Sequence, residues 1–221
     1  MTMKWAQIVI AATLALTLSG RRSLAQLSGA EAENESFQVG LRLGISAADG
    51  EPANDIPWAG LFGRYRLNEL WLVGLSLDIS EYDYEQPAKI IGLDPAEVVD
   101  AQADSTIITA WLEREFRSEN GRWRPFILGG LGFGIVDVPD ASGDLKGGGR
   151  FDIETDAGTE IIPMVGAGIR MRLTQRIHAE VGARGEFHLA DWEIKDRVSG
   201  TSGSIDDYFA YGGYFGLGCN F

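Results

Sequence analysis

The sequence of 221 residues contains one cysteine, Cys219, so no disulfide can form within a single chain. Beyond residue 25 it also lacks any continuous apolar run of the roughly 20 residues that a membrane-spanning helix needs. Basic residues are scarce, with 19 Lys and Arg against 32 Asp and Glu and a net charge of −13. These shortages argue against a disulfide-built scaffold, a helical membrane protein and a nucleic-acid-binding protein, which needs a basic footprint.

Glycine is abundant, at 29 residues, and much of it lies in segments with a two-residue period. Residues 209–221 show this period most clearly, because large apolar residues alternate there with small or polar ones. The apolar positions include Phe209, Tyr211, Phe215, Leu217 and Phe221. This pattern predicts a strand with one apolar face and aromatic residues at both ends, as in a lipid-facing barrel strand. A buried edge strand of a soluble sandwich is the alternative.

The same alternation recurs along the chain and predicts eight strands. They cover residues 37–46, 59–67, 71–80, 108–116, 127–135, 164–173, 177–188 and 209–221. The connections alternate between long and short, which is typical of outer-membrane barrels with short periplasmic turns and long external loops. A soluble sandwich gives no reason for that alternation.

The four long connections, residues 47–57, 81–104, 137–160 and 190–207, each carry more acidic than basic residues. We expect them to be solvated external loops, with shared divalent cations and lipopolysaccharide phosphates as an alternative use of the acids. Within the second loop, Asp94, Pro95 and Glu97 have the spacing of a capped helix start. They predict a short helix over residues 95–101.

One face of the predicted strands carries charged residues on strand after strand. These charges would point outward in a soluble lipocalin-like barrel and inward in a membrane barrel. The aromatic strand ends favour the membrane barrel, and an eight-stranded barrel has room inside only for side chains. We therefore predict an interior charge network, with one layer near the periplasmic turns and with Glu180 and Arg184 as partners closer to mid-barrel. Its members are Arg42, Arg64, Arg66, Asp78, Glu113, Glu115, Arg170, Arg172, Glu180, Arg184 and Glu186.

Arg114 is the exception on this reading, since it falls on the lipid-facing side of the fourth strand. It lies near the periplasmic end, where its guanidinium can reach the headgroups. The opposite register would place Glu113 and Glu115 in lipid, at a higher cost.

Residues 123–134, residues 166–173 and the Phe221 ending resemble the small outer-membrane protein beta-barrel domain family, similar to the OmpA transmembrane domain. The resemblance covers residues 37–221. It implies an all-β, eight-stranded antiparallel up-and-down transmembrane barrel in the bacterial outer membrane, monomeric and in contact with lipid and lipopolysaccharide. It also implies that the barrel assembly machinery and periplasmic chaperones read the final strand, through Tyr211, Phe215, Leu217 and Phe221.

Residues 1–25 are predicted to be a cleaved signal peptide. Lys4 supplies its positive start, residues 8–18 its apolar core, and residues 23–25 its small-x-small cleavage site. An uncleaved anchor helix is the alternative, although the apolar core is short for a membrane span. Residues 26–36 are expected to be a polar periplasmic lead-in.

The family resemblance does not specify an activity. We expect a structural or surface-interaction role, through adhesion or binding by the acidic loops, with no cofactor and no metal. A narrow porin-like channel for small solutes is the alternative from another class. A calcium loop over Asp152, Glu154, Asp156 and Glu160 is disfavoured, because Gly158 does not stand where such a loop needs its glycine.

An enzyme acting on outer-leaflet lipid is the second alternative. His188 is the candidate catalytic residue, but residue 190 is alanine where similar lipid A deacylases have serine. Ser199, Ser202 and Ser204 are the other candidate nucleophiles, and they fall in a loop. We therefore expect no catalytic triad and no enzymatic activity.

Overall fold

The computed structural model describes residues 36–49, 56–85, 88, 91–97, 100–116, 122–155, 158–204 and 206–221. The predicted signal peptide and all but the last residue of the predicted lead-in lie outside the described residues. No helix in the described part of the chain is long and apolar enough to cross a membrane.

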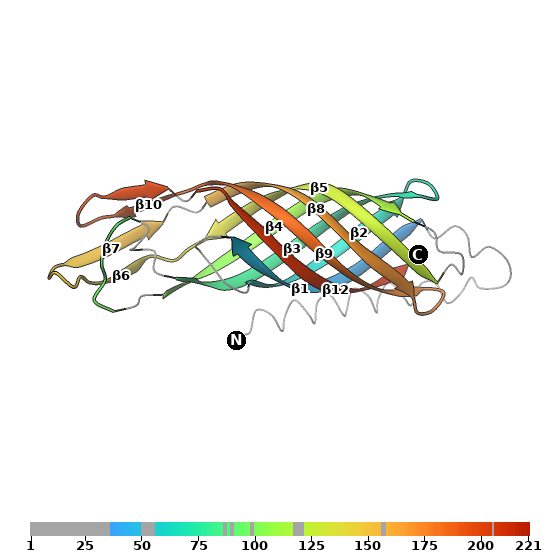
Figure 1. Cartoon of the computed structure of the whole chain (residues 1–221), viewed down its shortest axis with the longest axis horizontal. Coiled ribbons are helices and arrows are strands. Elements are labelled where there is room, and N and C mark those ends of the chain that lie inside the picture. Colours follow the sequence, from blue (N-terminus) through green and yellow to red (C-terminus); the bar gives the residue numbers. More distant parts are fainter. Residues whose placement is uncertain are drawn as a thin grey trace.

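Within these residues, eight strands form a closed antiparallel barrel, as the alternation predicted (Figure 1). Each barrel strand pairs with the barrel strand before it and the barrel strand after it along the chain, and the last pairs with the first. The barrel strands are β1 (Phe37–Asp49), β2 (Ile56–Arg66), β3 (Trp71–Glu85), β4 (Asp100–Glu115), β5 (Trp123–Asp137), β8 (Gly158–Arg172), β9 (Ile177–Asp191) and β12 (Tyr208–Asn220).

The barrel closes where β1 meets β12. The backbone N–H of Phe221 donates to the carbonyl of Phe37 over 2.8 Å, and Leu41 lies opposite Leu217 in the ladder. The predicted assembly residues Tyr211, Phe215, Leu217 and Phe221 all present exposed side chains on the outer wall.

The outer wall of the barrel is apolar. Leu43, Leu75, Leu131, Val165 and Val181 lie on five different strands and are each between 56% and 66% exposed. Aliphatic side chains exposed to this extent over a whole barrel need an apolar surrounding. Arg114 is exposed on the same wall, as predicted, and its guanidinium lies 5.7 Å from the Trp71 ring centroid.

Two of the short connections at one end of the barrel are closed by side-chain caps. Asn68 Oδ1 accepts hydrogen bonds from the N–H groups of Leu70 and Trp71, at 2.9 and 3.0 Å. Thr174 Oγ1 accepts in the same way from Arg176 and Ile177. Such side-chain hydrogen bonds fix tight turns because they satisfy backbone N–H groups that have no partner in the strand ladder.

The opposite end differs from the prediction. Residues 137–160 and 190–207 were expected to be loops, but they contain four short strands that form a second sheet, here called the loop sheet. Its strands, in spatial order, are β11 (Ser202–Ser204), β10 (Glu193–Asp196), β7 (Arg150–Thr155) and β6 (Ala141–Asp144). Figure 1 shows β6, β7 and β10 beyond this end of the barrel.

The helix predicted over residues 95–101 is wrong. Pro95 instead forms a β-bridge with Leu145, the N–H of Ala96 donates to the Asp144 carbonyl, and Asp100 already belongs to β4. The capping signals were present in the sequence, but pairing with the β6 end outweighs a short helix that buries little of its own surface.

The loop sheet has its own hydrophobic core. This core joins apolar residues of β6, β7 and β10 to the ends of barrel strands and to the second loop. Its buried members are Ile56, Ala88, Ile91, Ala103, Val136, Val138, Ala141, Phe151, Ile153, Trp192 and Ile194. The loop end is therefore a packed extension of the barrel.

Candidate functional site

The barrel interior near the short turns holds a buried ion-pair network. Arg64 contacts Glu113 at 3.0 Å and also pairs with Glu180. Arg170 reaches Glu113 at 2.8 Å and Glu180 at 3.2 Å. Arg42 donates to Glu180 at 2.7 Å, and both glutamate side chains have no exposed surface. We call these residues, with Glu115, the lower network.

Glu115 extends this network toward the short-turn end. It pairs with Arg66 at 2.7 Å, with Arg124 at 3.4 Å and with Arg170. Arg124 was not predicted as a member, because it lies just before the alternation of the fifth strand becomes clear. Arg172 lies opposite the buried His178 on the inward face but is itself exposed.

A glycine makes one of these pairs possible. In the ladder, Gly216 of β12 lies between Arg42 of β1 and Glu180 of β9. A Cβ atom at Gly216 would lie 2.8 Å from Glu180 Cγ and 3.2 Å from Arg42 Cγ. The missing side chain therefore leaves the space in which the two charged side chains meet.

A layer of large side chains fills the middle of the barrel. It includes Trp58, Phe62, Trp111, Phe126 and Tyr214, all nearly fully buried, together with Leu128 and Met164. The Arg42 guanidinium lies 4.4 Å from the Phe62 ring centroid and 4.9 Å from that of Trp111. This aromatic layer was not predicted, although its members occupy inward positions of the same alternating strands.

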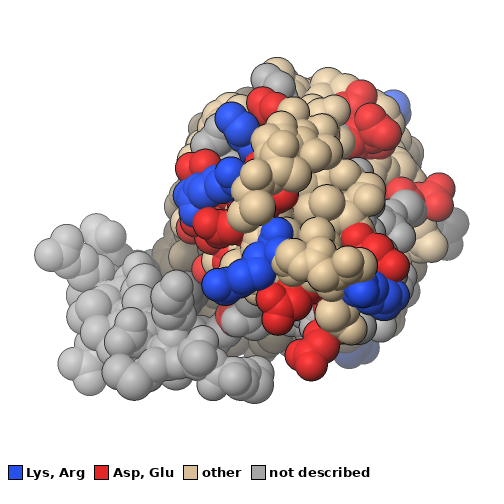
Figure 2. All heavy atoms as spheres, turned by 90° about the vertical axis from the view of Figure 1, so that its left-hand side faces the viewer, with Lys and Arg blue, Asp and Glu red and all other residues tan. Residues whose placement is uncertain are grey.

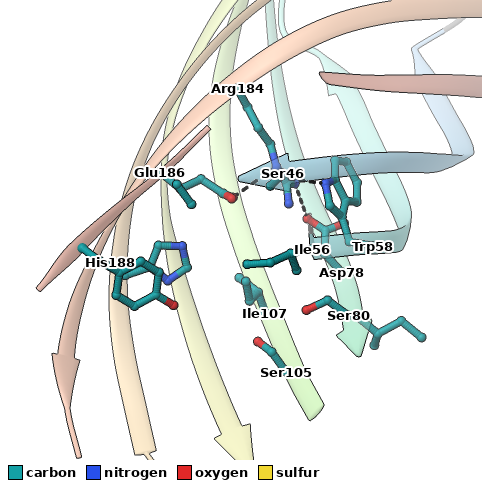
Figure 3. A pocket seen from close by; sticks show the side chains of 13 residues that line it. Ser46, Ile56, Trp58, Asp78, Ser80, Ser105, Ile107, Arg184, Glu186 and His188 are labelled. Carbon is teal, nitrogen blue, oxygen red and sulfur yellow. Dashed lines mark hydrogen bonds and ion pairs between the residues drawn. The ribbon is translucent and has the colours of Figure 1, made fainter. Parts of the chain in front are cut away.

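A small chamber lies between this layer and the loop end (Figure 3). Its volume is about 30 Å³, and Asp78, Arg184 and Glu186 line it. Arg184 donates to Asp78 Oδ2 at 2.7 Å, and its Nε lies 3.2 Å from Glu186 Oε1. The predicted pairing of Arg184 with Glu180 is wrong, because Arg184 pairs with these two carboxylates and Glu180 belongs to the lower network.

His188 also lines the chamber. Its Nδ1 lies 2.6 Å from Glu160 Oε2, its ring stacks on Tyr208 at a centroid distance of 4.3 Å, and Tyr208 donates to Glu160. The side chain of His188 is thus held inside the barrel, away from the lipid-facing wall. Extending the β8 alternation back from Met164 would have placed Glu160 on the inward face.

Asp196 connects the strands of the loop sheet. Its Oδ1 accepts from the N–H of Asp152 at 2.8 Å, and its Oδ2 accepts from the N–H and hydroxyl of Ser199 at 2.9 and 2.6 Å. Burial raises the pKa of this carboxyl, but these hydrogen bonds and one from Val198 outweigh it and lower the pKa to about 2.

The residues of the disfavoured calcium loop point to different places in the structure. Asp152 and Glu154 face Arg197, whose guanidinium also lies 3.0 Å from Asp140. Glu160 points into the barrel toward His188. Residue 156 lies outside the described residues. No group of three or more His, Cys, Asp or Glu side chains in the described chain is placed to hold a metal ion.

A closed antiparallel barrel with an apolar outer wall and a charged, filled interior is a transmembrane β-barrel. A comparison with protein families shows to which family this barrel belongs. The model of the outer membrane protein beta-barrel domain matches residues 11–221, and the chain belongs to this family, whose members are bacterial outer-membrane proteins.

Two solved structures illustrate the likeness. The chain is similar to Neisserial surface protein A, with a TM-score of 0.53 and 16% identity over 88% of this chain and 100% of that one. It is also similar to the outer membrane protein OprG from Pseudomonas aeruginosa, with a TM-score of 0.56 and 11% identity over 84% and 95% of the two chains. At these identities the likeness shows the fold alone. No curated protein matches the chain.

Proposed function

We propose that this outer-membrane barrel has a structural or surface-interaction role, exercised through its loop sheet. The observation that carries the proposal is the loop end itself, where four short strands pack on a hydrophobic core of their own. Loops that only connect strands need no such core. A rigid sheet at the external end instead presents a fixed surface to a partner.

The surface of this end carries both signs of charge. Figure 2 shows blue and red side chains side by side where the loop end faces the viewer. On the loop sheet, Asp152, Glu154 and Lys195 alternate with the buried Phe151, Ile153 and Ile194 and lie on the opposite face. Such a mixed polar face suits contacts whose specificity comes from charge complementarity.

The interior speaks against the narrow pore. The lower network, the aromatic layer and the loop-sheet core lie one after another along the barrel. A solute would have to separate buried ion pairs and displace packed rings. The interior also speaks against the lipid-modifying enzyme, because His188 is enclosed with Glu160 and Tyr208 and residue 190 is alanine.

We also propose partners for the outer wall. Lipid and lipopolysaccharide would cover the apolar wall of a monomer, and the chain would be exported by its signal peptide. Assembly machinery and periplasmic chaperones would bind β12 through Phe215, Leu217 and Phe221, which form an exposed apolar row.

The test compares bacteria that display the full chain with bacteria that display a barrel whose residues 138–156 and 192–206 are replaced by short Gly-Ser turns. Attachment to protein-coated surfaces, cell–cell aggregation and resistance of the envelope to detergent are measured at matched outer-membrane levels. We expect the barrel without the loop sheet to lose attachment or aggregation if it acts by surface interaction, and to lose envelope resistance if it acts structurally. Equal behaviour of the two strains in all assays would contradict the proposal.

A further inference from the structure

The short-turn end of the barrel, which lies opposite the loop sheet in Figure 1, is rich in arginine. Within the described residues of this end, Glu69 is the one exposed acidic side chain. The exposed or half-buried arginines there are Arg66, Arg114, Arg122, Arg124, Arg172 and Arg176. The four long connections carry an excess of acids, so the two ends of the barrel differ in the sign of their charge.

The buried ion pairs do not neutralise this end. Glu115 is shared by three arginines, because Arg66 at 2.7 Å, Arg124 at 3.4 Å and also Arg170 contact its carboxylate. With them, the ion-paired cluster contains Arg42, Arg64, Arg66, Arg124 and Arg170 against Glu113, Glu115 and Glu180. Arginine stays protonated in proteins, so this cluster keeps two positive charges in excess.

Two further arginines face each other beyond this cluster. The N–H of Arg172 donates to the carbonyl of Arg122 over 3.1 Å, one step past the ladder pair of Trp123 and Met171. Side chains opposite each other in an antiparallel ladder lie about 5 Å apart, and like charges in these positions repel. Arg172 forms no ion pair with an acid within the described part of the chain. An anion between the two guanidiniums would offset their repulsion.

The facing arginines lie at the level of the aromatic side chains of the outer wall. Trp123 follows Arg122 directly and is 43% exposed. On the neighbouring strand, the Arg114 guanidinium lies 5.4 Å from the ring centroid of Phe116, which is 40% exposed. Exposed aromatic rings at a strand end mark the interface between membrane and water. Lipid headgroups therefore surround the barrel at the depth of these arginines.

We infer that the short-turn end binds the phosphate groups of anionic phospholipids in the periplasmic leaflet. Short turns face the periplasm in barrels of this kind. A guanidinium suits a phosphate because it can donate two parallel hydrogen bonds to it. Anionic headgroups are favoured over zwitterionic ones, since they bring no ammonium group toward the arginines. The site lies at the other end from the loop sheet and is independent of the proposed surface role.

The test uses the refolded full chain in phosphatidylcholine vesicles. Phosphatidylglycerol brominated in its acyl chains replaces the host lipid stepwise, and quenching of tryptophan fluorescence reports the lipid next to Trp71 and Trp123. Each arginine near an anionic lipid contributes about fivefold in affinity, so the two facing arginines should give a preference of about 25-fold over brominated phosphatidylcholine. Equal quenching by the two brominated lipids at every mole fraction would overturn the inference.

Paired variants locate the effect. Arg122→Gln with Arg172→Gln should remove most of the preference, whereas Arg150→Gln with Lys195→Gln removes the same charge from exposed positions of the loop sheet and should keep it. Equal losses in both double variants would reduce the preference to net charge and overturn the site. If the first double variant does not refold, Arg172→Gln alone should lower the preference about fivefold.

A competition experiment identifies the source of the phosphate. Soluble glycerol phosphate is added to the vesicles at constant ionic strength. The preference for phosphatidylglycerol should persist, because the lipid is held at the interface at a high local concentration. Loss of the preference would show that the arginines take up a free phosphate, and would overturn the assignment to a lipid headgroup.

Discussion

The guanidinium of Arg170 lies 2.8 Å from the carboxylate of Glu113, although the two residues are 57 positions apart in the sequence. They belong to β8 and β4, which are not neighbours, because β5 lies between them in the barrel. The pair therefore spans the inside of the barrel past a whole strand. Together with Arg64, which reaches Glu113 from β2, it closes the interior at this depth.

Replacing Glu113 by alanine should be strongly destabilising. The change leaves Arg64 and Arg170 buried with one carboxylate fewer, and breaking a buried pair in this way costs about 3–5 kcal/mol. The free energy of unfolding, measured by urea titration in detergent micelles, checks this. Glu97→Ala, at an exposed position in the second loop, is the control and should change it by less than about 0.5 kcal/mol. Equal effects of the two changes would show that the pairs add nothing.

Gly216→Ala should separate Arg42 from Glu180. The added methyl group would lie 2.8 Å from Glu180 Cγ, so one side chain has to move, at a cost of about 1–3 kcal/mol. Gly213→Ala, on the same strand, is the matched control. Its methyl group meets its nearest neighbour at 3.7 Å, which is ordinary contact. Unfolding measurements that find Gly213→Ala equally costly would rule out this role of Gly216.

Arg114→Leu should be nearly neutral. The guanidinium lies outside the barrel, 5.7 Å from the Trp71 ring and 5.4 Å from the Phe116 ring, and exposed contacts of this kind contribute about 0.5–1 kcal/mol. The added leucine offsets part of that loss by joining the apolar wall. A loss of several kcal/mol on urea unfolding would mean that Arg114 faces inward and that β4 has the other register.

The loop sheet should weaken in acid before the barrel does. The folded pKa of Asp196 is about 2, below its usual 3.8, so its stabilisation is complete above about pH 4. It is lost as the pH falls through 2. Hydrogen exchange of the β7 and β10 amides should therefore accelerate, relative to β4 amides, between pH 4 and pH 2. Asp196→Asn should remove this dependence, and an unchanged pH profile in that variant would refute the role of Asp196.

The barrel could be predicted from the sequence because the alternation of apolar and polar residues is long. Each of the eight strands alternates over many residues, and a one-residue shift in register would place Glu113 and Glu115 in lipid. The lower network followed from the same pattern, since Arg64, Glu113 and Arg170 occupy inward positions near the same end. Which carboxylate each arginine meets depends on strand order and depth, so those pairs required the structure.

Two predictions differ from the structure, and each difference has a physical reason. Glu180 and Arg184 share one face of β9, but four residues along a strand separate them by about 13 Å, too far for a direct pair. The loop sheet was missed because β6, β7, β10 and β11 span only three to six residues each. Their alternation, as in residues 150–155, is too short to distinguish from a Gly- and Asp-rich loop. Packing against the shared core and the hydrogen bonds of Asp196 stabilise them in the folded chain.

The side chains of the barrel fill its interior, and we propose that the protein acts through its external surface. Conductance of the purified, refolded full chain in planar lipid bilayers tests this most directly. The structure predicts no steady single-channel current for the unaltered protein, because the lower network and the aromatic layer fill the interior. A steady conductance that does not change in Glu113→Ala would contradict the account and favour the narrow pore.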